Sequence, residues 1–514
     1  MPSENYTRKS AINAAIGLAT NIISCLVGFV SRAIFLRFLT TEYLGVNGLF
    51  SNILTILSFA ELGIGEAMAF AMYKPMKDQQ KEKMQRLLGF YKKAYVVIAL
   101  VVFVLGFAIS FFLDYLITDK PNIPEKIPIL FWLFLINNTV SYFMAYKQAV
   151  LVVDQKQYVV SLVRQFIHIG QVVLQCFILF STRNYYLYLF CQIFGTLLTN
   201  LCLSIYVKYK YPWIQRRGQD TLEADDKHAI FADIKALAIS KIAGVVSNGA
   251  DSIITAKLFG LAPVGLVSNY SMVTSTINGF VWSALSSITG SIGQFNVDSS
   301  VERKRNVFDE IYLATFWIYA VVCICFMILL DPFVSVWLGA QYIIEKSVTA
   351  ALVFNIFVGG LNFPFYTFRV TSGIFAPMKY YYVSYAVVNI VLSIVLGSQF
   401  GLAGVFAATF FARLICVEWK EGKVVFGDIL QYKFSQFLLK YSASVGVLLV
   451  TYCVVQFVVD LVRIEGWGGL FIKAIICFLT VNMAFCVIFA KTKAFKGLHK
   501  KAKNLFLGIQ RKFR

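Results

Sequence analysis

Apolar runs of about 20 residues, separated by short polar breaks, recur along the whole chain. A helix needs about 20 predominantly apolar residues to cross a bilayer. The pattern therefore predicts an all-α integral membrane protein with about 14 transmembrane helices. The expected spans are Ala11–Leu36, Val46–Met72, Ala94–Leu116, Ile127–Tyr146, Tyr158–Phe180, Tyr185–Val207, Leu237–Leu258, Val264–Ile292, Ile311–Phe333, Val348–Phe368, Tyr380–Gly397, Leu402–Val417, Phe437–Val459 and Gly468–Ala490.

Composition and charge agree with this prediction. Of the 514 residues, 58% are hydrophobic and 14% are charged, against roughly a quarter charged in a soluble domain. This balance excludes a soluble enzyme. The net charge of +20 is a topology signal, because cytoplasmic loops concentrate Lys and Arg. A cytoplasmic N-terminus places most Lys and Arg on the inner side, so both termini are expected in the cytoplasm.

The polar connections divide the chain into parts. We expect an N-terminal lobe of six spans (1–207), a cytoplasmic connection with an interfacial helix (208–236) and a second lobe of six spans (237–420). Two further spans (421–490) precede a basic cytoplasmic tail (491–514) in which Lys and Arg alternate with apolar residues. Such a tail favours anionic membrane lipid over nucleic acid as its partner.

An internal repeat supports two similar lobes. A shift of 220 residues places Leu44-Gly45-Val46 on Val264-Gly265-Leu266, without a gap. The match lies at the start of the second and of the eighth expected span, so six spans separate equivalent positions. Because six is even, both copies enter the membrane in the same direction, and a pseudo-two-fold axis along the membrane normal is expected to relate them.

The residues near the N-terminus also indicate a family. The segment Arg32–Leu39, the run Glu42-Tyr43-Leu44-Gly45-Val46 and the run Phe59–Ala67 resemble the start of bacterial polysaccharide flippases, the lipid-linked oligosaccharide exporters of the multidrug/oligosaccharidyl-lipid/polysaccharide superfamily. The resemblance implies two six-helix lobes around a cavity that faces each side in turn, and outward movement of undecaprenyl-diphosphate-linked sugars. The last two spans are similar to the lipid II flippase branch, which leaves the subfamily open.

A few polar side chains at membrane depth are candidates for the cavity, because charge there is costly unless it meets water or a partner. Asn21 and Arg32 lie on one polar face of the first span, and Ser247 and Asp251 lie on a similar face of the seventh. The alternative for the small residues on these faces is close helix packing.

Glu61, near the middle of the second span, is the main candidate for ion coupling. Glu66, five residues closer to the cytoplasm, is a second candidate that either shares the cavity or extends its carboxylate to the membrane surface. A carboxylate that exchanges a proton or sodium ion can couple an ion gradient to movement of the lobes. The alternative is an ion pair between Glu61 and Arg32 or Arg37 that only positions helices.

Arg164 and Arg369 lie at the inner ends of the fifth and tenth spans. They are either ordinary positive-inside anchors or ligands for the substrate diphosphate, which guanidinium groups bind bidentately. Gly359, Gly360 and Pro364 interrupt the tenth span, where a hinge is plausible.

The leading hypothesis is a flippase of the bacterial inner membrane that moves lipid-linked oligosaccharide for cell-surface polysaccharide biosynthesis, by alternating access driven by protons or sodium. Polysaccharide polymerase machinery is a candidate partner. The alternatives are a cation-coupled multidrug exporter of the same fold and a membrane polysaccharide polymerase. We expect no enzyme activity, cofactor or metal site, because histidines are few, no phosphate-binding loop occurs, and the ten cysteines lie mostly within apolar runs.

Overall fold

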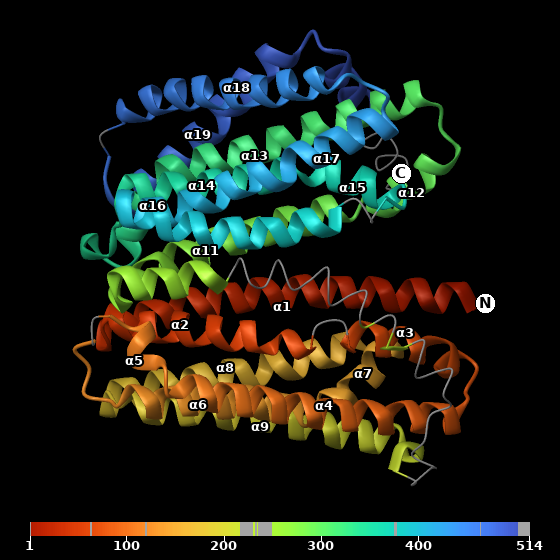
Figure 1. The fold of residues 1–514 in the computed structure, drawn as a ribbon, viewed down its shortest axis with the longest axis vertical. Helices are drawn as coiled ribbons and strands as arrows, with labels where there is room; N and C mark the ends of the chain where they lie inside the picture. Colours follow the sequence, from red (N-terminus) through yellow and green to blue (C-terminus); the bar gives the residue numbers. More distant parts are fainter. Residues whose placement is uncertain are drawn as a thin grey trace. The chain divides into compact units, whose positions relative to one another are not determined.

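The computed structural model describes residues 2–61, 64–118, 121–215, 230–231, 234, 249–374, 378–462 and 464–501. These residues form helices and turns (Figure 1). The longer elements are α1 (Pro2–Phe38), α2 (Thr41–Leu57), α3 (Ile64–Lys77), α4 (Lys81–Ser110), α6 (Ile127–Tyr142), α7 (Ala145–Val153), α8 (Gln157–Thr182), α9 (Tyr185–Lys210), α11 (Leu261–Ser286), α12 (Thr289–Asp298), α13 (Val301–Trp337), α14 (Lys346–Leu361), α15 (Phe363–Thr371), α16 (Lys379–Arg413), α18 (Phe434–Asp460) and α19 (Gly466–Phe489).

Large apolar side chains cover the outside of these helices. On α8, Phe166, Phe177 and Phe180 are 83%, 64% and 74% exposed. Such surfaces are unfavourable in water but suit contact with lipid. Within the described residues, nine helices are long and apolar enough to cross a membrane, and the bent pair α6–α7 raises the number to ten. The chain is therefore a multi-pass membrane protein.

The spans agree closely with the apolar runs where the pattern is long and uninterrupted. The expected span Tyr158–Phe180 corresponds to α8, and Tyr185–Val207 corresponds to α9. The helix assigned as α16 contains non-helical backbone at Phe400 and at Gly401, which has a φ of 65°. This break lies where the sequence separates the eleventh and twelfth spans. The full count of 14 remains a prediction, because the seventh expected span falls largely outside the described residues.

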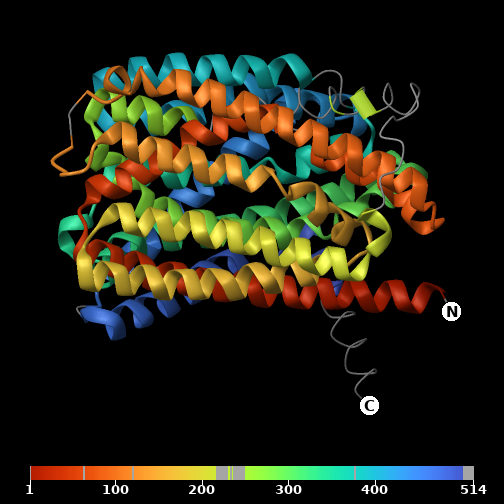
Figure 2. The same cartoon turned by 90° about the horizontal axis from the view of Figure 1, so that it is seen from below.

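The chain forms two compact units, Met1–Gly265 and Leu266–Arg514. In the first unit α8 packs between α1 and α9, and α6 packs against α4 and α9. These helices run along a common direction, which Figure 1 and Figure 2 show from two sides. The second expected span is divided: α2 ends at Leu57, a 3-10 turn, η1 (Ser58–Glu61), follows, and α3 begins at Ile64.

The repeat found in the sequence has a direct counterpart in the first unit. A Cβ atom on Gly45 of α2 would lie 2.0 Å from the Leu261 carbonyl oxygen, and one on Gly265 of α11 would lie 2.1 Å from the Thr41 carbonyl oxygen. Thr41 and Leu261 are also equivalent under the 220-residue shift. The contact is thus reciprocal: each glycine allows the equivalent backbone of the other copy to approach.

In the second unit, α13 packs against α14, α15, α18 and α19, and α14 packs against α16. The tenth expected span is broken at Asn362, where α14 ends, and Pro364 occupies the first turn of α15. Proline is tolerated there because the first turn of a helix has no intrahelical acceptor for its N–H. After α16, the helix continues through a π-helical segment (Leu414–Glu418), α17 (Trp419–Val424) and a second π-helical segment (Val425–Ile429).

The start of the basic tail packs on the protein. Phe495 stacks on Trp317 of α13, with ring centroids 5.9 Å apart, and Lys501 pairs with Glu310 of the same helix. Residues 502–514 lie outside the described part of the chain, so attraction of the tail to anionic lipid stays a prediction.

Candidate functional site

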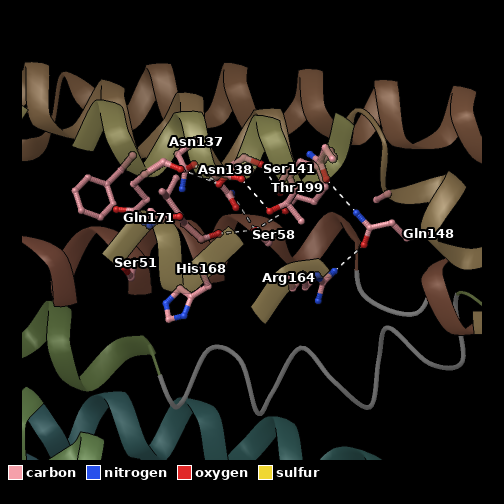
Figure 3. Close-up of a pocket in the computed structure, with 18 of the residues that line it drawn as sticks. Ser51, Ser58, Asn137, Asn138, Ser141, Gln148, Arg164, His168, Gln171 and Thr199 are labelled. Carbon is pink, nitrogen blue, oxygen red and sulfur yellow. Dashed lines mark hydrogen bonds between the residues drawn. The ribbon is translucent and has the colours of Figure 1, made fainter. Parts of the chain in front are cut away.

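A polar cavity of about 880 Å³ lies inside the first unit, within the range typical of ligand pockets. Six elements line it: α1, α2 with η1, α6, α7, α8 and α9 (Figure 3). Seven of its lining residues are Asn or Gln, and they are Asn137, Asn138, Gln148, Gln165, Gln171, Gln192 and Asn200. Among the described lining residues, the charged or titratable groups at neutral pH are Glu61, Arg164 and His168.

Helical periodicity explains why these polar groups converge. On α8, Arg164, His168 and Gln171 follow at intervals of four and three residues, which places them on one face of the helix. Gln192, Thr196 and Thr199 form a matching stripe on α9. The opposite faces carry the large apolar side chains that meet lipid. Each helix is therefore amphipathic, with its polar stripe turned toward the cavity.

Glu61 occupies one end of the cavity, at the last residue of η1. The Tyr95 hydroxyl on α4 donates a hydrogen bond to Glu61 Oε1 at 2.9 Å, and the Tyr91 hydroxyl lies 3.3 Å from that of Tyr95. The Tyr142 hydroxyl and the Asn138 amide donate to Ser58 Oγ at 2.7 and 3.3 Å. The carboxylate therefore sits in a hydrogen-bonded network, next to the break between η1 and α3.

Arg164 occupies another part of the lining. Its Nη2 donates to Gln148 Oε1 at 2.7 Å, and Gln148 Nε2 donates to Asn200 Oδ1 at 3.0 Å (Figure 3). This chain of bonds links α8, α7 and α9. No carboxylate pairs with Arg164 among the ion pairs of the described residues, and the guanidinium is held by the amide oxygen of Gln148.

Two buried atoms of the lining lack a hydrogen-bond partner in the described structure. Gln165 Oε1 accepts from Ser24 Oγ at 2.5 Å, but Gln165 Nε2 is unpartnered, as is His168 Nδ1. Buried polar groups are nearly always hydrogen-bonded. The cavity thus offers unused donor and acceptor capacity, which water or a polar ligand can satisfy.

The structure brings Glu61 and Arg164 into one cavity, and the other sequence candidates that it describes do not line that cavity. Arg32 is half-buried near Tyr188 of α9, and Asn21 is exposed on α1. Glu66 is exposed on α3. Asp251 is half-buried in the helical stretch 249–259, whose neighbouring Ser252 accepts from Asn52 at 2.8 Å. Ser247 lies outside the described residues.

Arg369 lies in the second unit and is 3% exposed. Its Nη2 is 3.1 Å from Glu421 Oε1, and its Nη1 donates to the Ile374 carbonyl oxygen at 2.9 Å. The guanidinium is thus paired inside the second unit and not exposed at a surface. Its role in substrate binding stays a prediction.

The amide residues of the cavity were not predicted as site residues. Their signal is visible in the sequence, since polar residues recur every three or four positions within the apolar runs of α6, α8 and α9. Uncharged amides are tolerated in transmembrane helices as packing contacts, so the stripe alone does not distinguish a cavity from a helix interface. The polar stripes of the three helices converge on one space, and this convergence distinguishes a cavity from a helix interface.

The chain resembles known proteins in sequence and in fold. The family model described as polysaccharide biosynthesis protein matches residues 10–289, more than half of the chain. No curated protein matches the sequence. Among solved structures, a lipid II flippase MurJ in an inward closed conformation aligns with a TM-score of 0.67 and 15% identity, covering 93% of this chain and 99% of its own.

Two transporters of the MATE family share the fold as well. An inward-facing multidrug resistance MATE transporter has a TM-score of 0.57 and 12% identity, covering 80% of this chain and 98% of its own. A Vibrio cholerae MATE transporter has a TM-score of 0.50 and 14% identity, covering 83% of this chain and all of its own. At these identities the likeness establishes the two-lobed transporter fold. With the family match, it places this chain in the polysaccharide biosynthesis protein family, on a fold shared with flippases and multidrug transporters.

Proposed function

We propose that this protein is a flippase that carries an undecaprenyl-diphosphate-linked oligosaccharide from the inner to the outer leaflet of the bacterial cytoplasmic membrane, with both termini in the cytoplasm. The family match and the transporter fold support this role. The physical difficulty of the task is the passage of a polar head group through hydrocarbon. A polar cavity within an apolar helical unit lowers that barrier, while the prenyl chain stays in lipid.

The observation that carries the proposal is the amide-rich lining of the cavity. An Asn or Gln side chain both donates and accepts hydrogen bonds, as a sugar hydroxyl does. Seven such residues with one arginine, one histidine and one carboxylate suit a head group that is mostly hydroxyl with limited negative charge. A multidrug exporter of cationic drugs would favour a more acidic and aromatic cavity.

One substitution tests whether the cavity binds sugar without removing a side-chain hydrogen bond of the described structure. Gln192 lines the cavity, and no side-chain hydrogen bond is described for it. Gln192→Leu is therefore expected to weaken binding of a polyprenyl-diphosphate oligosaccharide by about fivefold, since a net hydrogen bond contributes about 1 kcal/mol. Binding of polyprenyl diphosphate without sugar should be unchanged.

The matched control is Gln436→Leu, at an exposed position in α18 outside the cavity. Isothermal titration in nanodiscs would measure both ligands with both variants. Equal loss of affinity for the sugar-bearing and sugar-free lipids, or equal effects of the two variants, would remove the cavity from sugar recognition.

We further infer that Glu61 couples transport to an ion gradient, by exchanging a proton or sodium ion. Its carboxylate is half-buried, accepts from Tyr95, and lies at the end of η1, the 3-10 turn that follows α2. Glu61→Gln keeps the shape and removes the charge, so gradient-driven transport should be lost at a normal protein level in the membrane. Glu302→Gln, at an exposed position at the start of α13, is the matched control. Full gradient dependence in the Glu61 variant would exclude this role.

A further inference from the structure

A second group of ionisable side chains is buried in the second unit, and the proposed function does not use it. Its members are Glu418, at the end of the first π-helical segment, and Glu421 in α17, which are 2% and 0% exposed. Two guanidinium groups, Arg369 and Arg413, lie beside them. Charged side chains are costly at membrane depth and are expected to be paired or functional.

The two carboxylates have different surroundings. Glu421 Oε1 lies 3.1 Å from Arg369 Nη2 and accepts from the Tyr382 hydroxyl at 2.7 Å. These contacts hold a full negative charge well, because charge-assisted hydrogen bonds are the strong ones. Glu421 and Arg369 therefore form a charge-balanced pair, in which Glu421 Oε2 and Arg369 Nε have no hydrogen-bond partner in the described structure.

Glu418 lacks such support. Its Oε2 accepts from Asn362 Nδ2 at 2.8 Å, but its Oε1 has no hydrogen-bond partner. The Arg413 Nε is 3.9 Å from Oε1, which is too long for a hydrogen bond, and the Arg413 side chain is 36% exposed. A buried carboxylate with one neutral donor, a distant cation and a second carboxylate three residues away is unfavourable as an anion.

Other titratable groups around Glu418 do not supply the missing charge. The hydroxyl groups of three tyrosines interact with it electrostatically, and the Tyr441 hydroxyl has no hydrogen-bond partner in the described structure. The charged and titratable groups that face Glu418 are Arg413 and Glu421 on its own helical run, Arg369 on α15, Tyr382 on α16, Tyr312 on α13 and Tyr441 on α18.

We propose that Glu418 binds an exchangeable proton, which makes it a proton site in the second unit, separate from Glu61. On binding, a hydronium ion gives up its proton: an O–H bond of hydronium breaks, an O–H bond forms on the carboxylate, water leaves, and the negative charge of Glu418 is lost. The half-exposed Arg413 side chain marks the side from which the proton can arrive. When Glu418 is neutral, the buried charges that remain are those of Arg369 and Glu421, and they cancel.

The proposed proton site is hydrogen-bonded to the residue between α14 and α15. Asn362, the hydrogen-bond donor to Glu418, is the residue at which α14 ends and α15 begins. Hydrogen bonds to an ionised acceptor are about twice as strong as those between neutral groups. Loss of the proton therefore strengthens the bond between this break and the helix that bears Glu418, and uptake of the proton weakens it.

Infrared difference spectroscopy on the full-length protein in nanodiscs tests this site without a transport assay. The wild type is expected to show the carbonyl stretch of a protonated buried carboxylic acid near neutral pH, which disappears as the pH is raised. Glu418→Gln should lose this titrating band. Glu345→Gln, an exposed carboxylate at the start of α14, is the control and should keep it. A band of full intensity in Glu418→Gln would overturn the proposal.

A second variant keeps the test decisive if Glu418→Gln does not fold. Asn362→Ala removes the one hydrogen bond that favours ionised Glu418, so the band should persist to a higher pH than in the wild type. A band that titrates at an unchanged pH in Asn362→Ala would overturn the assignment to Glu418. Because these readouts need no substrate, their failure would leave the proposed flippase function intact.

Discussion

The reciprocal glycine contact makes a prediction whose sign can be worked out from the structure. A methyl group on Gly45 would lie 2.0 Å from the Leu261 carbonyl oxygen, and one on Gly265 would lie 2.1 Å from that of Thr41. Ordinary van der Waals contact begins at 3.4 Å. The obstructing atoms belong to the backbone, so α2 and the start of α11 must move apart to accommodate alanine.

Overpacking of this kind costs about 1–3 kcal/mol, and the higher helix propensity of alanine offsets up to about 1 kcal/mol of it. Gly45→Ala and Gly265→Ala should therefore each destabilise the protein by about 1–2 kcal/mol. Gly170→Ala in α8 is the matched control, because a Cβ atom added to Gly170 would meet nothing within 4 Å. That variant gains propensity without a clash and should be slightly more stable than the wild type.

The double variant is more diagnostic. One separation of the two segments relieves both clashes, so the combined loss should be smaller than the sum of the single losses. Thermal unfolding in one detergent can be followed with a thiol-reactive fluorophore, because buried cysteines such as Cys191 and Cys323 become accessible. Losses that add fully, or single variants as stable as Gly170→Ala, would refute the reciprocal contact.

Two further predictions concern stability. Gly360→Ala should cost more than Gly359→Ala, because a Cβ atom at Gly360 meets the buried ring of Tyr319 at 2.2 Å, whereas one at Gly359 meets the flexible end of Arg413; equal unfolding midpoints would contradict this. At the turn between α7 and α8, burial alone would lower the pKa of Lys156, but its bonds to Asp154 and to the Tyr211 hydroxyl raise it above its ordinary value. The stabilisation is therefore present below the unfolded-state pKa of about 10.5 and lost as the pH rises through the folded-state value. Asp154→Asn should lower the free energy of unfolding by about 1 kcal/mol, and by the same amount at pH values of about 6 and 9. A loss that appears only at the higher pH would contradict the upward direction of the Lys156 pKa shift.

The sequence predicted the parts of the fold that local pattern controls. Uninterrupted apolar runs gave α8 and α9 almost to the residue at their N-terminal ends. The match of Gly45 and Gly265 corresponds to a reciprocal contact, because a Cβ atom at either position would meet the backbone at the start of the other segment. The 3-10 turn η1 was not predicted, because the glycines that could mark the end of a helix, Gly63 and Gly65, follow several residues after α2 ends at Leu57.

The burial of the charged residues in the second unit could not be predicted from the local sequence pattern. The cluster of charged residues after Val417 indicated the end of the twelfth span, but the helix continues through Glu418 and Glu421. Their burial depends on Asn362 and Arg369, which are more than 50 residues away in the sequence. Arg164 and Glu61 were found because single charges stand out in apolar runs, whereas the amides that complete the cavity do not.

We propose that the polar cavity serves the passage of a lipid-linked oligosaccharide. The most direct measurement is the translocation of a fluorescent prenyl-diphosphate oligosaccharide in liposomes that contain the purified protein, with and without a pH gradient. We expect the translocation rate to be higher in liposomes with the wild-type protein than in protein-free liposomes. Gln192→Leu should lower this rate, and Gln436→Leu should leave it unchanged. Transport of a cationic dye in place of the lipid, with no movement of the oligosaccharide under any gradient, would contradict it.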